Sequence, residues 1–233
     1  NRYWTSINDI DYSKDMARQR MFNMVNLWST TEHALGYLAK ADSIPHRTEG
    51  EAVLLDYIPT SAKRILDLGT GDGRLMALLK IDRPQATGIA LDFSPIMVEK
   101  AKARFQDDRS IEVISHNLDD PLPDLGKFDA IVSSFAIHHV THDRKKSLYS
   151  EIFDRLTPGG VFANLEHVAS PNQKVHIQFL NKIGRTPETE DPSNKLLDLE
   201  SQLQYLREIG FADVDCYWKW LELALLIGIK PSN

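Results

Sequence analysis

One short stretch of the sequence combines residue types that suit a ligand lying on the main chain. Residues 67–73 read Asp-Leu-Gly-Thr-Gly-Asp-Gly, and an apolar run lies on either side. Glycine tolerates positive φ and has no side chain, so a ligand can approach such a turn closely. This order of residues predicts a strand, a tight turn and a helix whose first N–H groups have no partner within the helix. We therefore expect a ligand-binding turn here.

The spacing of the glycines distinguishes several kinds of nucleotide site. A mononucleotide P-loop requires Gly-Lys-Ser/Thr, which does not follow here. A dinucleotide fingerprint places its third glycine three residues after the second, whereas Gly69, Gly71 and Gly73 are evenly spaced. A plain strand-to-helix turn seldom needs three glycines with an acid ahead of them. The remaining interpretation is an adenosyl ligand without a pyrophosphate.

Histidines follow two predicted strands and offer proton-transfer chemistry. His138 and His139 come after the fourth predicted strand, and Glu166 and His167 lie at the end of the fifth. An imidazole near its ordinary pKa can take a proton at neutral pH. We predict catalytic roles for these four residues, with His138 as the first candidate. A convergent His/Glu/His cluster would suit either a metal or hydrogen bonding behind the site, and we favour the second because no tight metal-ligand spacing is present.

The order of the predicted elements places these residues at the carboxyl edge of a sheet, but the sequence leaves open whether they converge. From residue 63 the pattern alternates between strands and helices, which predicts a doubly wound, mostly parallel α/β sheet with helices on both faces. The predicted parallel strands are residues 64–68, 86–91, 111–115, 128–133 and 161–165, with a turn at residues 158–160. The predicted helices are residues 73–79, a helix opened by Ser94-Pro95, and residues 145–156, 173–183 and 196–209.

Two further strands at the C-terminal end complete a seven-stranded sheet. They are predicted at residues 212–220 and 223–229, and such a short connection permits only an antiparallel pair. The N-terminal residues differ, because apolar residues recur there at helical spacing, for example over residues 15–27 and 47–57. We therefore expect a helical cap or lid at residues 1–60 and a ligand-binding domain at residues 61–233.

Composition limits the partners of the protein. The 233 residues carry a net charge of −6, so there is no overall basic footprint and nucleic acid is an unexpected partner. Cys216 is the only cysteine, which excludes an internal disulfide and a Cys-rich zinc site. The longest apolar stretch, residues 221–229, contains Glu222 and is too short to span a bilayer. We expect a cytoplasmic protein without a membrane partner, and a homodimer is compatible with these features.

Residues 67–73 resemble motif I of the class I S-adenosylmethionine-dependent methyltransferases. Three further features agree: Asp92 closes the second strand, residues 116–123 follow the third, and residues 156–160 precede the fifth. The resemblance covers about residues 63–230, and the antiparallel hairpin also fits this Rossmann-like methyltransferase fold. It implies methyl transfer from S-adenosylmethionine by in-line displacement, with S-adenosylhomocysteine as the product. The leaving sulfur is neutral, so a base is needed only if the acceptor must lose a proton.

The resemblance also implies ligand contacts. Asp92 would accept the ribose hydroxyls, Phe93 would lie against adenine, and Asn117 with the main chain of Leu118 would contact the adenine edge. Asp67 either orients the turn or contacts the ligand. Arg47 either pairs with the methionine carboxylate of the ligand or lies exposed at a helix start. The full predicted set is Arg47, Asp67, Gly69, Thr70, Gly71, Gly73, Asp92, Phe93, Asn117, Leu118, Ser133 and Ser134.

Other stretches resemble a narrower group of proteins. Residues 44–47, 136–139 and 218–220 resemble bacterial methyltransferases of mostly unassigned substrate, with a weaker likeness to the carboxy-S-adenosylmethionine synthase of wobble-uridine modification. The acidic balance favours a small-molecule acceptor over RNA or DNA. The alternatives are an RNA- or nucleotide-modifying relative, and a protein that binds S-adenosylmethionine without turnover.

Overall fold

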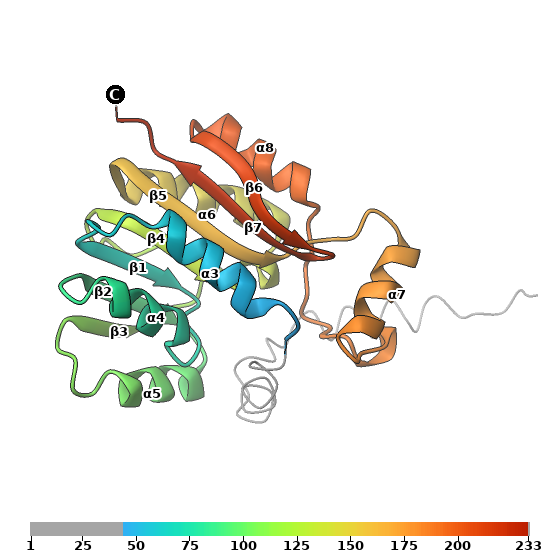
Figure 1. Ribbon diagram of the computed structural model, residues 1–233, viewed down its shortest axis with the longest axis horizontal. Coiled ribbons are helices and arrows are strands. Elements are labelled where there is room, and N and C mark those ends of the chain that lie inside the picture. Colours follow the sequence, from blue (N-terminus) through green and yellow to red (C-terminus); the bar gives the residue numbers. More distant parts are fainter. Residues whose placement is uncertain (1–43, 233) are drawn as a thin grey trace, which may run out of the picture.

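The candidate residues lie at one end of a sheet whose strands run in the order β3-β2-β1-β4-β5-β7-β6. The computed structural model describes residues 44–232, and seven strands form this sheet (Figure 1). β7 runs antiparallel to both of its neighbours, and the other pairings are parallel. The strands are β1 (Arg64–Leu68), β2 (Thr87–Asp92), β3 (Ile111–Ser115), β4 (Phe128–Ser134), β5 (Leu156–His167), β6 (Ala212–Trp220) and β7 (Leu223–Ile229).

Helices cover both faces of this sheet. Figure 1 shows α3 (Arg47–Tyr57) and α4 (Arg74–Asp82) in front of the sheet, and α6 (His142–Arg155) and α8 (Leu199–Ile209) behind it. Successive strand residues point to opposite faces, so Ile65 joins the apolar core under α3 and α4, whereas Leu66 joins the core under α6 and α8. The remaining elements are α5 (Pro95–Arg104), α7 (Gln173–Lys182) and two short 3₁₀ helices, η2 (Ile137–His139) and η3 (Pro187–Thr189).

The predicted fold is confirmed, with one local correction. The doubly wound, seven-stranded sheet and its antiparallel hairpin are present, and most elements begin and end within three residues of the prediction. The predicted turn at residues 158–160 is wrong, because β5 already begins at Leu156, which pairs with Phe128. Gly159, with a φ of 76°, interrupts the regular register, and its N–H donates to the carbonyl of Lys230 at 2.8 Å. Pairing along the sheet thus absorbs a sequence that in isolation favours a turn.

The predicted N-terminal cap is described only in part. Its first helix, residues 15–27, lies outside the described residues. The described part is α3. Its residue Leu54, and Ile58 directly after it, belong to the apolar core over the sheet. The division of the chain at residue 60 therefore stays a prediction. Within residues 44–232, no helix is long and apolar enough to cross a membrane.

A buried carboxylate attaches α7 to the sheet. Glu222 precedes β7 and is 1% exposed; its carboxylate accepts from His167 Nε2 at 2.8 Å, from His176 Nδ1 at 2.9 Å, and from the Ser170 hydroxyl. His176 lies on α7, and its Nε2 contacts Glu190 at 3.1 Å. Both imidazole nitrogens face carboxylates, so both carry protons in this arrangement and the ring is an imidazolium.

The charge of His176 makes the attachment of α7 dependent on pH. Burial by itself would lower the pKa of His176, but the hydrogen bonds and charges of Glu222 and Glu190 outweigh it, and the pKa is raised above 6.5. The stabilisation is therefore complete below about pH 6.5 and is lost as the pH rises through the raised value.

We predict that His176→Gln lowers the free energy of unfolding by about 1–2 kcal/mol at pH 6, because a charged hydrogen-bond donor is lost. The difference from wild type should shrink as the pH is raised to 9, as measured by urea unfolding at each pH. The exposed His46, which pairs with the surface residue Glu49 and lies against the ring of Trp220, provides the control His46→Gln, whose effect should not depend on pH in the same way. A difference at His176 that does not change with pH would contradict this assignment.

Candidate active site

A cavity opens beside the glycine turn, where β1, β2 and β4 end. We call it the turn cavity. Carboxyl ends of parallel strands are where open α/β sheets bind ligands. The lining residues come from the glycine turn, from the ends of β2 and β4, from the segments after β2, β3 and β4, and from α3, α4 and α5. They are Arg47, Asp67, Gly69, Thr70, Gly71, Asp72, Arg74, Leu75, Asp92, Phe93, Met97, Arg104, His116, Asn117, Leu118, Asp119, Ser134, Phe135, Ala136, His139 and Val140.

The glycines of the turn serve different purposes. Gly69 and Gly71 have φ values of 67° and 59°, which favour glycine. A Cβ on Gly71 would meet nothing within 4 Å, so its main chain borders open space, whereas a Cβ on Gly69 would lie 2.2 Å from the Cβ of Ala136. Gly73 does not line the turn cavity, and a Cβ there would lie 2.5 Å from Phe105. Gly73 therefore permits close packing against the end of α5, and its predicted ligand contact gains no support from this geometry.

Two buried carboxylates hold the turn in place. The Thr70 hydroxyl donates to Asp67 Oδ2 at 2.6 Å. The main-chain N–H groups of Gly71 and Ser94 donate to the two oxygens of Asp92, each at 2.9 Å. Burial raises the pKa of Asp67 to about 7 and that of Asp92 to about 6. Each Asp92 oxygen keeps a further lone pair, so the same carboxylate can accept ligand hydroxyls while it orients the turn.

Polar atoms in this wall suit a polar ligand. Asp67 Oδ1, His116 Nε2 and Ser134 Oγ line the turn cavity and are buried, with no hydrogen-bond partner among residues 44–232. Buried polar groups in proteins are normally paired, so such atoms mark a place where a ligand supplies partners. Ser133 differs, because its hydroxyl donates to the Leu68 carbonyl at 2.8 Å inside the sheet and it does not line the turn cavity.

Arg47 is not exposed at the helix start. It is 6% exposed, and its Nε donates to Glu51 at 2.9 Å. Arg74 reaches the same carboxylate at 2.9 Å, so two arginines share one acid at the wall of the turn cavity. Glu51 and Arg74 were not among the predicted site residues, although the spacing of Arg47 and Glu51 by four residues on a helix was a usable signal.

A second cavity adjoins the turn cavity. We call it the histidine cavity, and it shares Phe135 and His139 with the first. Apolar side chains form much of its wall, and three of its histidines lie close together, with His138 centred 4.0 Å from His139 and 5.5 Å from His167. Its lining is Ile44, Pro45, Phe135, His138, His139, His167, Phe179, Leu180, Ile183, Arg185, Glu190, Asp191, Asn194 and Leu223.

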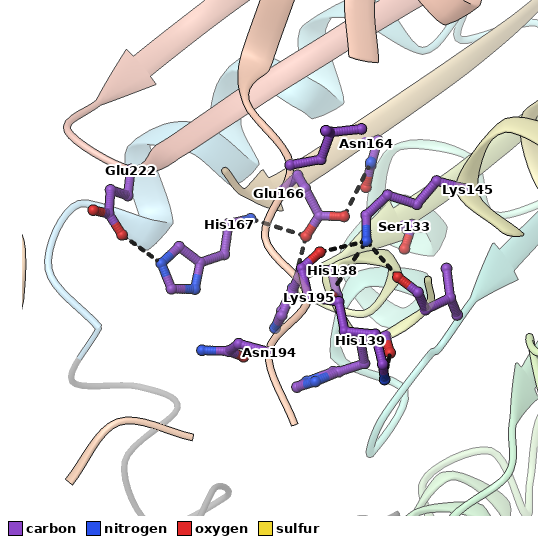
Figure 2. Close-up of polar contacts among 12 residues, drawn as sticks. Ser133, His138, His139, Lys145, Asn164, Glu166, His167, Asn194, Lys195 and Glu222 are labelled. Atoms are coloured by element: carbon purple, nitrogen blue, oxygen red, sulfur yellow. Dashed lines mark hydrogen bonds and ion pairs between the residues drawn. The ribbon is translucent and has the colours of Figure 1, made fainter. Parts of the chain in front are cut away.

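Glu166 lies behind His138 and orients it (Figure 2). His138 Nδ1 is 2.7 Å from Glu166 Oε1, and the carboxylate also accepts from the His167 N–H at 2.9 Å and from Asn164 Nδ2 at 3.4 Å. Burial raises the pKa of Glu166, whereas the charge of Lys145 and these hydrogen bonds favour the carboxylate. With Glu166 as the acceptor, His138 carries its proton on Nδ1 and keeps a lone pair on Nε2.

His138 is a neutral imidazole at neutral pH. Burial lowers its pKa well below 6.5, and the nearby charges of His167 and Lys145 act in the same direction. Burial also lowers the pKa of His139, whose Nδ1 lies 2.9 Å from the Ser193 hydroxyl. His138 and His167 thus meet at the histidine cavity, a convergence that the sequence left open. His139 borders both cavities, and Glu166 supports His138 from behind.

Two lysines fix the turn that carries His138 and His139. Lys145 is fully buried, and its Nζ donates to the carbonyls of Val140 at 2.5 Å and Lys195 at 2.7 Å (Figure 2). Burial lowers the pKa of Lys145 to about 8. Lys195 donates through its N–H to the His138 carbonyl at 2.9 Å and through Nζ to the His139 carbonyl at 2.7 Å. The burial of Lys145 was not predicted, because a lysine on a helix usually faces solvent.

A metal is not indicated by the residues that the structure describes. Over residues 44–232, no group of three or more His, Cys, Asp or Glu side chains is arranged to hold a metal ion. Several polar side chains of the histidine cavity have partners within the protein instead: His138 contacts Glu166, His139 contacts Ser193 and Glu190 contacts His176.

Known proteins match this chain in sequence. Residues 65–160 match a family model described as a methyltransferase domain. A carboxy-S-adenosyl-L-methionine synthase of Desulforapulum autotrophicum is 27% identical over 189 residues, which cover 72% of this chain and 75% of the relative. A demethylmenaquinone methyltransferase of Clavibacter sepedonicus is 32% identical over 191 residues, which cover 75% of this chain and 76% of the relative.

The fold is also similar to that of solved methyltransferases. Human N-acetylserotonin methyltransferase in complex with S-adenosylmethionine superposes with a TM-score of 0.64 at 18% identity. The match covers 88% of this chain, which spans 58% of the human structure. Sequence and fold therefore agree with the glycine turn and the seven-stranded sheet: the chain belongs to the class I S-adenosylmethionine-dependent methyltransferases, enzymes that use S-adenosylmethionine as their cofactor.

Proposed function

We propose that this enzyme transfers the methyl group of S-adenosylmethionine to a small acceptor bound in the histidine cavity. The observation that carries this proposal is the contact between the two cavities, which share Phe135 and His139. A donor in the turn cavity and an acceptor in the histidine cavity would meet at these two residues. Methyl transfer needs this alignment of nucleophile, methyl and sulfur more than any other assistance.

The turn cavity has the groups that an adenosyl and methionine ligand requires. Asp92 suits the ribose hydroxyls, Phe93 the adenine face, and Asn117 with the Leu118 main chain the adenine edge. At the other end, Arg47 suits the methionine carboxylate, because its buried guanidinium lines the turn cavity and can donate hydrogen bonds to a carboxylate. When bound, S-adenosylmethionine supplies an electrophilic methyl group on a positive sulfur.

His138 is suited to remove a proton from the acceptor. An acceptor O–H or N–H loses its proton to His138 Nε2 as the bond to the methyl forms and the bond from methyl to sulfur breaks. Glu166, 2.7 Å from Nδ1, then stabilises the imidazolium. The lowered pKa keeps His138 ready as a base over the neutral range.

The acceptor side favours a small molecule over a nucleic acid. Glu190 and Asp191 line the histidine cavity, and the chain carries a net charge of −6, both of which disfavour a phosphate backbone. Ile44 and Pro45, which belong to the predicted lid at residues 1–60, also line it, and this supports a role for that segment at the acceptor site. A cytoplasmic location and a homodimer stay predictions from the sequence.

The second candidate function is the formation of carboxy-S-adenosylmethionine. The match to the synthase of Desulforapulum autotrophicum, over 72% of this chain and 75% of that relative, favours it. In that case S-adenosylmethionine itself would be modified, and no methylated acceptor would form.

The two functions differ in their products. We predict that enzyme incubated with S-adenosylmethionine carrying a trideuterated methyl group, together with a small-molecule extract, releases S-adenosylhomocysteine and a labelled small molecule, detected by mass spectrometry. A carboxylated S-adenosylmethionine without label transfer would instead identify the second function. Tight S-adenosylmethionine binding with neither product would favour a protein without turnover.

We predict that Asp92→Asn weakens S-adenosylhomocysteine binding about tenfold to a hundredfold, because a charged acceptor for the ribose hydroxyls becomes a neutral amide. Isothermal titration calorimetry measures the affinity. Asp107→Asn, at an exposed acid after α5, is the matched control with unchanged affinity. An affinity unaltered by Asp92→Asn in a folded variant would rule out the ribose contact.

We predict that His138→Gln lowers kcat for methyl transfer about 10²- to 10⁴-fold, the usual contribution of a general base, while the affinity for S-adenosylhomocysteine stays unchanged. Because the pKa of His138 is lowered, wild-type activity should stay constant from pH 8 down past 6.5 and fall only at lower pH. The exposed His142, which lines neither cavity, provides the control His142→Gln. Full activity of His138→Gln would remove this residue as the base.

A further inference from the structure

One positively charged side chain in the histidine cavity has no partner within the described chain. Arg185 lines this cavity and is partly buried. Among residues 44–232, its guanidinium makes no hydrogen bond or ion pair. The other arginines that line the two cavities differ, because Arg47 and Arg74 pair with Glu51 and Arg104 pairs with Asp72.

The main chain holds Arg185 in a defined place. The N–H of Arg185 donates to the Leu180 carbonyl at 2.8 Å, and that of Gly184 donates to the Asn181 carbonyl at 3.3 Å. With Gly184 at a φ of 68°, these bonds form a Schellman motif that ends α7. Since His176 fastens α7 to the sheet, the position of Arg185 at the cavity wall is set by the fold.

The acids of the same cavity are already occupied. Glu190 contacts His176 Nε2 at 3.1 Å and accepts from Asn194 at 3.3 Å. Asp191 accepts from the N–H of Ser193 at 2.9 Å and from its hydroxyl at 2.7 Å. Both acids thus have partners within the protein, and Arg185 is the charged side chain of this wall whose guanidinium has none among residues 44–232.

We propose that the acceptor is a small acid with a flat apolar body, of the hydroxyaryl carboxylate kind. Its anion pairs with Arg185, its body lies against Phe135 and Phe179, and its nucleophile faces His138. A planar guanidinium favours a carboxylate, to which it can donate two parallel hydrogen bonds. This inference rests on the proposed function, because it takes the histidine cavity as the acceptor site.

The test measures binding and therefore does not depend on turnover. The enzyme is saturated with S-adenosylhomocysteine and titrated by calorimetry with three probes of similar shape: 4-hydroxyphenylacetate, the neutral 4-hydroxyphenylacetamide, and the cation tyramine. Wild type should bind the acid about tenfold more tightly than the amide, as expected for one charge-assisted pair. Arg185→Gln should remove that preference and leave amide binding unchanged. Arg185→Glu should bind tyramine in preference to the acid.

Lys182→Gln is the matched control, because Lys182 is an exposed cation at the end of the same helix that does not line the cavity. It should keep the wild-type preference for the acid. The proposal is overturned if the wild-type complex does not bind the acid, if it binds acid and amide equally, or if Arg185→Gln keeps the preference. A clear, Arg185-dependent preference for the acid without any methylated product would support Arg185 as an acid-binding residue and contradict the proposed methyl transfer.

Discussion

The buried carboxylate of Glu166 is the constraint on which the site depends. A carboxylate that is shielded from water is costly unless charge and hydrogen bonds compensate it. Here His138, the His167 N–H and Asn164 surround it, and Lys145 supplies a nearby positive charge. These contacts orient His138, and the hydrogen bonds of Lys145 join η2 to the segment before α8. One buried charge therefore connects β5, η2, α6 and the wall of the histidine cavity.

The two cavities have different structural origins. The turn cavity is a product of the parallel sheet, because β1, β2 and β4 end there with the glycine turn and Asp92. The histidine cavity depends on the departure from that pattern after β5, where α7 and the segment containing Glu190 lie outside the two helical layers (Figure 1). Glu222, at the start of β7, ties that region to the sheet through His167 and His176. The turn cavity thus belongs to the parallel sheet, and the histidine cavity to the segment that follows β5.

Local patterns predicted the fold and the position of the glycine turn well, because β strands and tight turns depend on residues that are close in sequence. Contacts over long separations were harder to predict. His138 lies near Glu166 because the neighbouring strands β4 and β5 end side by side. The burial of Lys145 depends on contacts that are distant in sequence, because its ammonium group is stabilised by the carbonyl of Lys195 and by the carbonyls at the end of η2. Ser133 and Gly73 fitted the motif, yet strand pairing and packing against Phe105 account for their positions. Residues 158–160, which were predicted as a turn, belong to β5, and this strand depends on its distant partners β4 and β7.

The central claim is that the methyl donor and acceptor meet where the two cavities join. A crystal structure of the enzyme with S-adenosylmethionine tests it most directly. The claim predicts that the ligand lies along the glycine turn with its ribose at Asp92 and its methyl group directed between Phe135 and His139 into the histidine cavity. A methyl group directed to solvent, or away from these two residues, would contradict it.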